Sequence, residues 1–133
     1  MSEITRNDLK VILMFGIHIA KIDDDFAVWE KNILNRFADA MGLTETEREK
    51  LTGEKISLAE GLLKLSGKEA KSLLLKTLCA VSHSDGEAHD KEIDFISKVF
   101  SKLGDQMFML PRSEWGVYES EVFATLESLN LTD

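Results

Sequence analysis

Two acidic segments of the sequence carry the side chains that are best suited to chemistry. In the first segment Asp23 is followed seven residues later by Glu30, and in the second Asp85 is followed seven residues later by Glu92. Each segment separates two stretches of helical character, so each Asp falls in a loop and each Glu in the first turns of the next helix. Carboxylate oxygens gathered on a tight loop are the ligands that hard divalent cations prefer. The spacing therefore predicts a divalent metal site.

Further donors stand beside these four acids. Asp24 adds oxygens to the first segment, Glu87 adds oxygens to the second, and His83 adds an imidazole. Imidazole suits zinc, nickel or copper better than calcium, so the identity of the metal stays open. The EF-hand loop, with glycine at its sixth position and glutamate at its twelfth, is not matched. The predicted ligands are Asp23, Asp24, Glu30, His83, Asp85, Glu87 and Glu92.

The same acids have an explanation that needs no ligand. An aspartate in front of a helix caps free backbone N–H groups. Acids in the first helical turn also interact favourably with the helix dipole. Gly86 supplies a turn conformation that other residues avoid. Helix capping therefore remains the alternative to metal binding.

The two acidic segments lie inside an internal repeat. Residues 13–42 match residues 75–104, with the same order of long helix, acidic loop, amphipathic helix and glycine stop. The identical pairs are Leu13 with Leu75, Asp23 with Asp85, Glu30 with Glu92, and Gly42 with Gly104. The repeat predicts a pseudo-duplicated helix-loop-helix unit. If the copies pack about a local two-fold axis, the acidic loops come together.

Apolar residues at three- and four-residue spacing predict helices along most of the chain. Thr44 with Glu47, and Ser57 with Glu60, have the spacing of capping boxes. The predicted helices cover residues 5–21, 26–43, 44–53, 57–65, 66–84, 91–104 and 113–131. The first of them has apolar residues around most of its circumference and is expected to be central and buried. The apolar anchors expected for the last of them are Trp115, Val117, Tyr118, Val122, Phe123, Leu126 and Leu129. The fold class is therefore all-α, a compact bundle of about seven helices. Residues 1–133 are expected to form a single domain.

Composition and charge exclude several kinds of partner. The 133 residues include 44% hydrophobic and 30% charged residues, a globular balance, with a net charge of −8. An acidic surface repels nucleic-acid phosphates and anionic membranes. No apolar stretch reaches the roughly 20 residues that span a bilayer, and no secretory signal is visible. We expect a cytoplasmic protein that does not insert into membranes.

Little in the sequence indicates catalysis. Cys79 lies in an apolar run and is expected to be a small buried hydrophobe, since His83 alone does not make it a nucleophile. His18 is expected to be a core histidine. Paired carboxylates can perform acid–base work, but that chemistry needs an aromatic-lined cleft, and the chain has two Trp and one Tyr. The sequence therefore predicts a protein that is not an enzyme.

The second acidic segment resembles the signature of the TerB-like, tellurite-resistance family. That signature is an Asp-Gly after a long helix, a Glu seven residues past the Asp, and an amphipathic helix that ends near a Gly. The matching positions are Asp85, Gly86, Glu92 and Ile96, in CAVSHSDGEAHDKEIDFISKVFSKLG. The first segment matches through Asp23 and Glu30, with Asp24 in place of the usual Gly. The resemblance extends over residues 9–104.

The resemblance implies a compact helical domain associated with stress responses, with a metal-linked acidic site and a role in binding or scaffolding. It implies no enzymatic activity. The first hypothesis is a TerB-like domain that binds a divalent cation between its two acidic loops. The alternative is a metal-free module for interaction with a protein partner or for scaffolding. It would show a docking groove near Trp115 and Tyr118, or form a homodimer.

Overall fold

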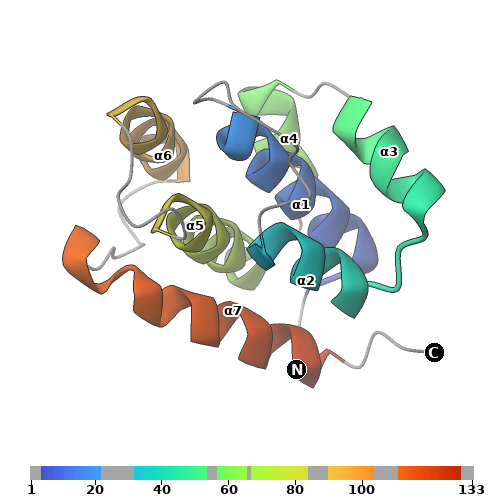
Figure 1. Cartoon of the computed structure of the whole chain (residues 1–133). Coiled ribbons are helices and arrows are strands. Elements are labelled where there is room, and N and C mark those ends of the chain that lie inside the picture. The colour runs from blue at the N-terminus through green and yellow to red at the C-terminus, as the bar shows by residue number, and fades with distance from the viewer. Residues whose placement is uncertain are drawn as a thin grey trace.

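The fold is a bundle of α-helices, as the sequence predicts. The computed structural model describes residues 4–21, 32–53, 57–65, 67–83, 90–103 and 111–129. Within these ranges there are seven α-helices, one short 3₁₀ helix (η2) and no strand (Figure 1). Their bounds are α1 Arg6–Lys21, α2 Asn32–Ala40, α3 Glu45–Gly53, α4 Leu58–Lys64, α5 Lys68–His83, α6 Asp90–Leu103, η2 Arg112–Glu114 and α7 Gly116–Ser128.

Two helices of 16 residues, α1 and α5, form the centre of the bundle. In Figure 1, α5 lies between α1 and α7, while α3 and α4 flank α1 on the side away from α7. Apolar residues cover most of the circumference of α1, which predicts burial on several sides. Leu9, Ile12 and Leu13 of α1 and Leu74 and Leu78 of α5 are completely buried. The central position expected for α1 is confirmed.

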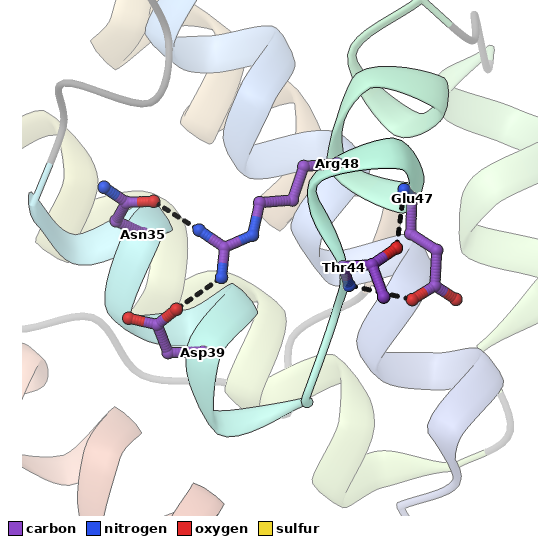
Figure 2. Close-up of polar contacts among 5 residues, drawn as sticks. All are labelled: Asn35, Asp39, Thr44, Glu47 and Arg48. Carbon is purple, nitrogen blue, oxygen red and sulfur yellow. Dashed lines mark hydrogen bonds and ion pairs between the residues drawn. The ribbon is translucent and has the colours of Figure 1, made fainter.

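Local capping signals set several helix ends. The backbone N–H of Thr44 donates to Glu47 Oε1 at 2.9 Å, and the N–H of Glu47 donates to Thr44 Oγ1 at 3.2 Å (Figure 2). This reciprocal pair is the predicted capping box at the start of α3. Ser57 accepts the N–H of Glu60 at 3.1 Å at the start of α4. Gly42, the predicted stop after α2, has the φ of 70° that favours glycine.

A reciprocal cap that the sequence analysis missed begins α1. The N–H of Thr5 donates to Asp8 Oδ2 at 2.9 Å, and the N–H of Asp8 donates to Thr5 Oγ1 at 3.1 Å. Aspartate here takes the place of the glutamate or glutamine of the usual capping box. The arrangement satisfies two N–H groups at the helix start and accounts for the burial of Asp8.

Polar contacts tie α3 to α2. Arg48 Nη1 donates to Asn35 Oδ1 at 2.7 Å, and Nη2 of the same guanidinium pairs with Asp39 (Figure 2). A planar guanidinium can hold two acceptors of one helix at once, which fixes the rotation of α3 relative to α2. These contacts orient the helices more than they stabilise them, since exposed ion pairs contribute little.

Cationic side chains also connect α7 to its neighbours. Arg36 of α2 pairs with Glu119 at 3.2 Å, and its guanidinium lies 3.9 Å from the centre of the Phe123 ring. Lys76 of α5 pairs with Glu121 at 2.9 Å. The buried face of α7 packs against the bundle, and these partly exposed polar contacts border that face without contributing much stability.

The end of the chain differs from the prediction in two respects. The single helix expected over residues 113–131 is instead the 3₁₀ turn η2 followed by α7. Val117 was expected to face the core, and that expectation is wrong, since 51% of the residue is exposed. Trp115, Tyr118 and Val122 form the buried face at three- and four-residue spacing. Position 117 lies about 100° around the helix from position 118, away from that face.

The helical parts of the predicted repeat are present. Each 16-residue helix, α1 and α5, precedes an acidic segment and a second helix, α2 or α6. Asp23, Glu30 and Asp85, which relate the acidic segments to each other, lie outside the described residues. The pseudo-duplication therefore stays a prediction.

Candidate functional site

The described residues flank both acidic segments. Residues 22–31 separate α1 from α2, and residues 84–89 separate α5 from α6. Five of the seven predicted ligands lie outside the described residues: Asp23, Asp24, Glu30, Asp85 and Glu87. The other two, His83 and Glu92, lie at the end of α5 and in the first turn of α6.

A tertiary contact joins the two flanks. The ring of His18, in the last turn of α1, lies 4.8 Å from the ring of Phe95, in the second turn of α6, between centroids. Phe95 also packs against Phe15 of α1, with 6.2 Å between ring centres. The helix end that precedes the first acidic segment therefore contacts the helix start that follows the second.

Two buried polar side chains belong to the helices around the second segment. Glu92 is completely buried although it carries a carboxyl group, and Ser82, next to last in α5, is completely buried as well. Among the described residues Ser82 Oγ has no hydrogen-bond partner. Buried hydroxyl and carboxyl groups lose hydration that a protein group, water or ligand has to replace. The bundle thus keeps polar groups inside it next to the second acidic segment.

His83 has a packing role that needs no metal. A Cβ built on Gly116, the first residue of α7, would lie 3.1 Å from His83 Nε2 and 3.3 Å from its Cδ2. The half-buried imidazole therefore lies directly against the backbone of α7. Glycine at position 116 leaves room for it, so the ring helps to position the start of α7.

His18 does not have the core environment expected from the sequence. The residue is exposed, although its ring contacts Phe95. The pKa of His18 lies below its usual 6.5. The larger cause is the partial burial of the ring, and the smaller cause is the positive charge of Lys21. The expectation is wrong because His18 occupies the outward-facing position of a helix that is buried on its other sides.

Cys79 is completely buried, as the sequence predicts. Burial raises the pKa of its thiol to about 12, because the thiolate would lose its hydration. The thiolate is the nucleophilic form, so this cysteine is inert at neutral pH.

The described residues do not complete a metal site by themselves. Within the described ranges, no three histidine, cysteine, aspartate or glutamate side chains gather closely enough to hold an ion. The chemistry of the donors nevertheless fits a divalent cation, with Glu92 as a buried carboxylate and acids in both adjoining segments.

A second candidate site is a groove between α1, α3 and α4, called here the α1–α3–α4 groove. Its volume is about 480 Å³. It is lined by Asn7, Lys10, Val11, Met14, Leu43, Glu47, Lys50, Leu51 and Lys64. The four residues from α1 follow an i, i+3, i+4, i+7 pattern, which places them on one helix face. Sequence reasoning missed this groove, and that stripe is the signal that marks it.

The docking region expected near Trp115 and Tyr118 is not an open surface. Both residues are buried, at 2% and 6% exposure, and belong to the hydrophobic core. Large aromatic side chains at helical spacing here serve the packing of α7.

Comparison with protein-family profiles, characterised proteins and solved structures finds no match to this chain. Among the described helices, none is long and apolar enough to cross a membrane.

Proposed function

We propose that this protein is a non-enzymatic, stress-associated, cytoplasmic domain of TerB-like type that binds a divalent cation between its two acidic segments. Asp23, Glu30, Asp85 and Glu92 would be the principal ligands. His83, Glu87 and Asp24 would support them. The bound cation would screen the repulsion between these carboxylates.

The contact between His18 and Phe95 is the observation that carries the proposal. Two loops can share an ion when the helices that lead into and out of them are in contact. The end of α1 leads into the first acidic segment, and the start of α6 leads out of the second. Glu92 lies one helical turn before Phe95, and Lys21 lies one turn after His18. This arrangement supports a shared site.

The burial of Ser82 and Glu92 supports the same location. A glutamate at the third position of a helix can also serve as a cap, so Glu92 by itself does not distinguish the two explanations. A metal ligand and a cap differ in their response to ions, and the test therefore uses that response.

The test is thermal unfolding of chelator-treated protein titrated with calcium, magnesium, manganese or zinc. An ion that binds the folded state stabilises it by about 2.7 kcal/mol at 100 times its Kd. We expect a saturable rise in Tm with at least one ion. The rise should be lost in Asp85→Ala and in Glu92→Gln, each compared with its own chelator-treated protein so that a lower starting stability does not matter.

Asp94→Ala is the matched control. Asp94 lies on the same helix as Glu92 and is 69% exposed, where it pairs with Lys98 at 3.4 Å. Its removal changes the net charge by the same amount, so the ion-dependent rise should persist. A flat response of the wild type to every ion would overturn the proposal, and so would a rise that survives in both ligand variants.

The α1–α3–α4 groove favours a second candidate function, a metal-free module for protein interaction. A half-open groove with an apolar floor suits a segment of a partner better than a reaction centre. This function predicts that a chelator leaves both stability and partner binding unchanged.

A further inference from the structure

We infer that the α1–α3–α4 groove binds an acidic amphipathic helix of a partner protein. The inference rests on the second candidate function, protein interaction, and names the chemistry of the partner. It is independent of metal binding, because the groove uses none of the predicted ligands.

The floor of the groove is apolar. Val11 and Met14 come from α1, Leu51 comes from α3, and Leu43 precedes α3. Val11, Leu43 and Leu51 form the base of the groove at 6–8% exposure, and Met14 is the partly exposed apolar side chain among them. A volume of about 480 Å³ is in the range of sites that enclose a few apolar side chains. An amphipathic helix presents such side chains at i, i+3, i+4 and i+7 to a groove of this kind. The floor therefore fits the apolar face of a helix.

The surrounding charge is positive, although the whole chain has a net charge of −8. Among the described residues that line the groove there are three lysines, Lys10, Lys50 and Lys64, and one carboxylate, that of Glu47, an excess of two positive charges within that set. Within the part of the chain that the structure describes, none of these lysines forms an ion pair. The charges of Lys50 and Lys64 are available to acidic groups of a partner. The charge of Lys10 also acts on the carboxylate of Glu47, whose pKa is lowered mainly by the backbone N–H of Thr44 and, to a smaller extent, by this lysine.

The distribution of the lysines favours a helix over a small amphiphile. Lys10, Lys50 and Lys64 belong to α1, α3 and α4, so positive charge borders the floor from three elements. A fatty acid offers a single carboxylate at one end, whereas an acidic amphipathic helix carries carboxylates on both borders of its apolar face. Single-stranded nucleic acid would need aromatic platforms, and none of the described residues that line the groove is aromatic.

The short helix α4 adds exposed apolar surface next to one of these lysines. Leu63, which precedes Lys64, is 85% exposed, the highest value among the large apolar residues that the structure describes. Leu63 itself is not among the described residues that line the groove, and a single exposed leucine is common on protein surfaces.

The test measures the affinity of fluorescent helical peptides for the full chain by anisotropy. The probe has leucines at i, i+3, i+4 and i+7 flanked by glutamates, and the comparison peptide has glutamine in place of each glutamate. We expect the acidic peptide to bind at least about tenfold more tightly, and its affinity to fall with added salt.

Lys50→Glu combined with Lys64→Glu should weaken the binding of the acidic peptide about tenfold, as expected for two charge pairs. Met14→Ala should weaken both peptides.

The matched control is Lys68→Glu combined with Lys102→Glu. Both residues are exposed on α5 and α6, outside the groove, and the change in net charge is the same. This variant should bind the acidic peptide like the wild type.

If the two peptides bind equally well and Met14→Ala weakens both, the groove binds helices without a preference for acidic ones. That result would overturn the inference of an acidic partner and leave protein interaction as the function of the groove. No binding of either peptide, or binding that ignores every groove variant, would overturn the inference. Competition by laurate at the same lysines would assign the groove to a fatty acid instead. A dimer that the groove variants dissociate in sedimentation equilibrium would assign it to a second copy of the chain.

Discussion

Gly16 of α1 lies so close to Leu34 of α2 that a Cβ on Gly16 would be 2.8 Å from Leu34 Cδ2. On another side, the same Cβ would be 4.0 Å from Thr77 Cγ2 of α5. Leu34 and Thr77 are both completely buried and have little room to move. Glycine in a helix costs up to about 1 kcal/mol relative to alanine. At Gly16 this cost is offset by the close approach of the central helix to its neighbours.

Gly16→Ala should therefore lower the free energy of unfolding by about 1–3 kcal/mol, the usual cost of overpacking a core. This sign is opposite to that of helix propensity. Urea denaturation measures the change. Gly53→Ala is the control, because a Cβ at Gly53 meets no atom of the described residues within 4 Å. That variant should be neutral or more stable. Equal effects at the two positions would show that α1 and α2 are less tightly packed than described.

The packing of His83 against Gly116 predicts an energetic coupling. Gly116→Ala alone should lower the free energy of unfolding by about 1 kcal/mol, because the ring must shift to accept the new methyl group. In a His83→Ala background the space is open, and the same change should be neutral or stabilising through helix propensity. Urea denaturation of the four proteins should give a coupling energy on the order of 0.5–3 kcal/mol. Additive effects would mean that the imidazole does not contact α7 in solution.

The lowered pKa of His18 predicts a pH dependence of stability. Burial of the ring and the charge of Lys21 disfavour the protonated imidazole in the folded state, so the unfolded chain binds more protons at pH values just below 6.5. Its contribution to stability is fully present above about 6.5 and is lost as the pH falls through the folded-state pKa. The free energy of unfolding should decline in this window more steeply in the wild type than in His18→Gln.

Removal of the positive charge of Lys21 provides the control for the measured pH dependence of stability. In Lys21→Gln the NMR-measured pKa of His18 should rise toward its usual value, and the decline of stability should shrink without disappearing. A His18 pKa at or above 6.5 in the folded wild type would contradict the described contact with Phe95. If the free energy of unfolding depends on pH identically in the wild type and in His18→Gln, the lowered pKa of His18 is contradicted as well.

Local chemistry explains which helix ends were predictable. Thr44 and Glu47 are three residues apart, and each accepts the N–H of the other whatever the rest of the fold does. Gly42 adopts its positive φ for a similarly local reason. The burial of Cys79 and of the central α1 also followed from apolar periodicity, since a helix with apolar residues on most sides has to be enclosed.

Predictions that needed knowledge of a neighbour were less successful. His18 was expected in the core and is exposed, because it lies on the outward-facing side of α1, where the contact with Phe95 of α6 leaves much of the residue uncovered. Trp115 and Tyr118 are buried, as expected for anchors of the last helix, but periodicity did not reveal that their burial leaves neither of them on an open surface. Periodicity gives the faces of one helix but does not say which of them a neighbouring helix covers.

The sequence by itself determined the all-α class, the positions of the helices in the described residues and the capping of several of them, because these depend on interactions within a few residues. The tertiary structure decided that the end of α1 meets the start of α6, that His83 lies against Gly116, and that Lys10, Lys50 and Lys64 border one groove. Each of these relationships joins residues that are distant in sequence. They arise from the way the helices pack to bury their apolar faces, which no short stretch of sequence encodes.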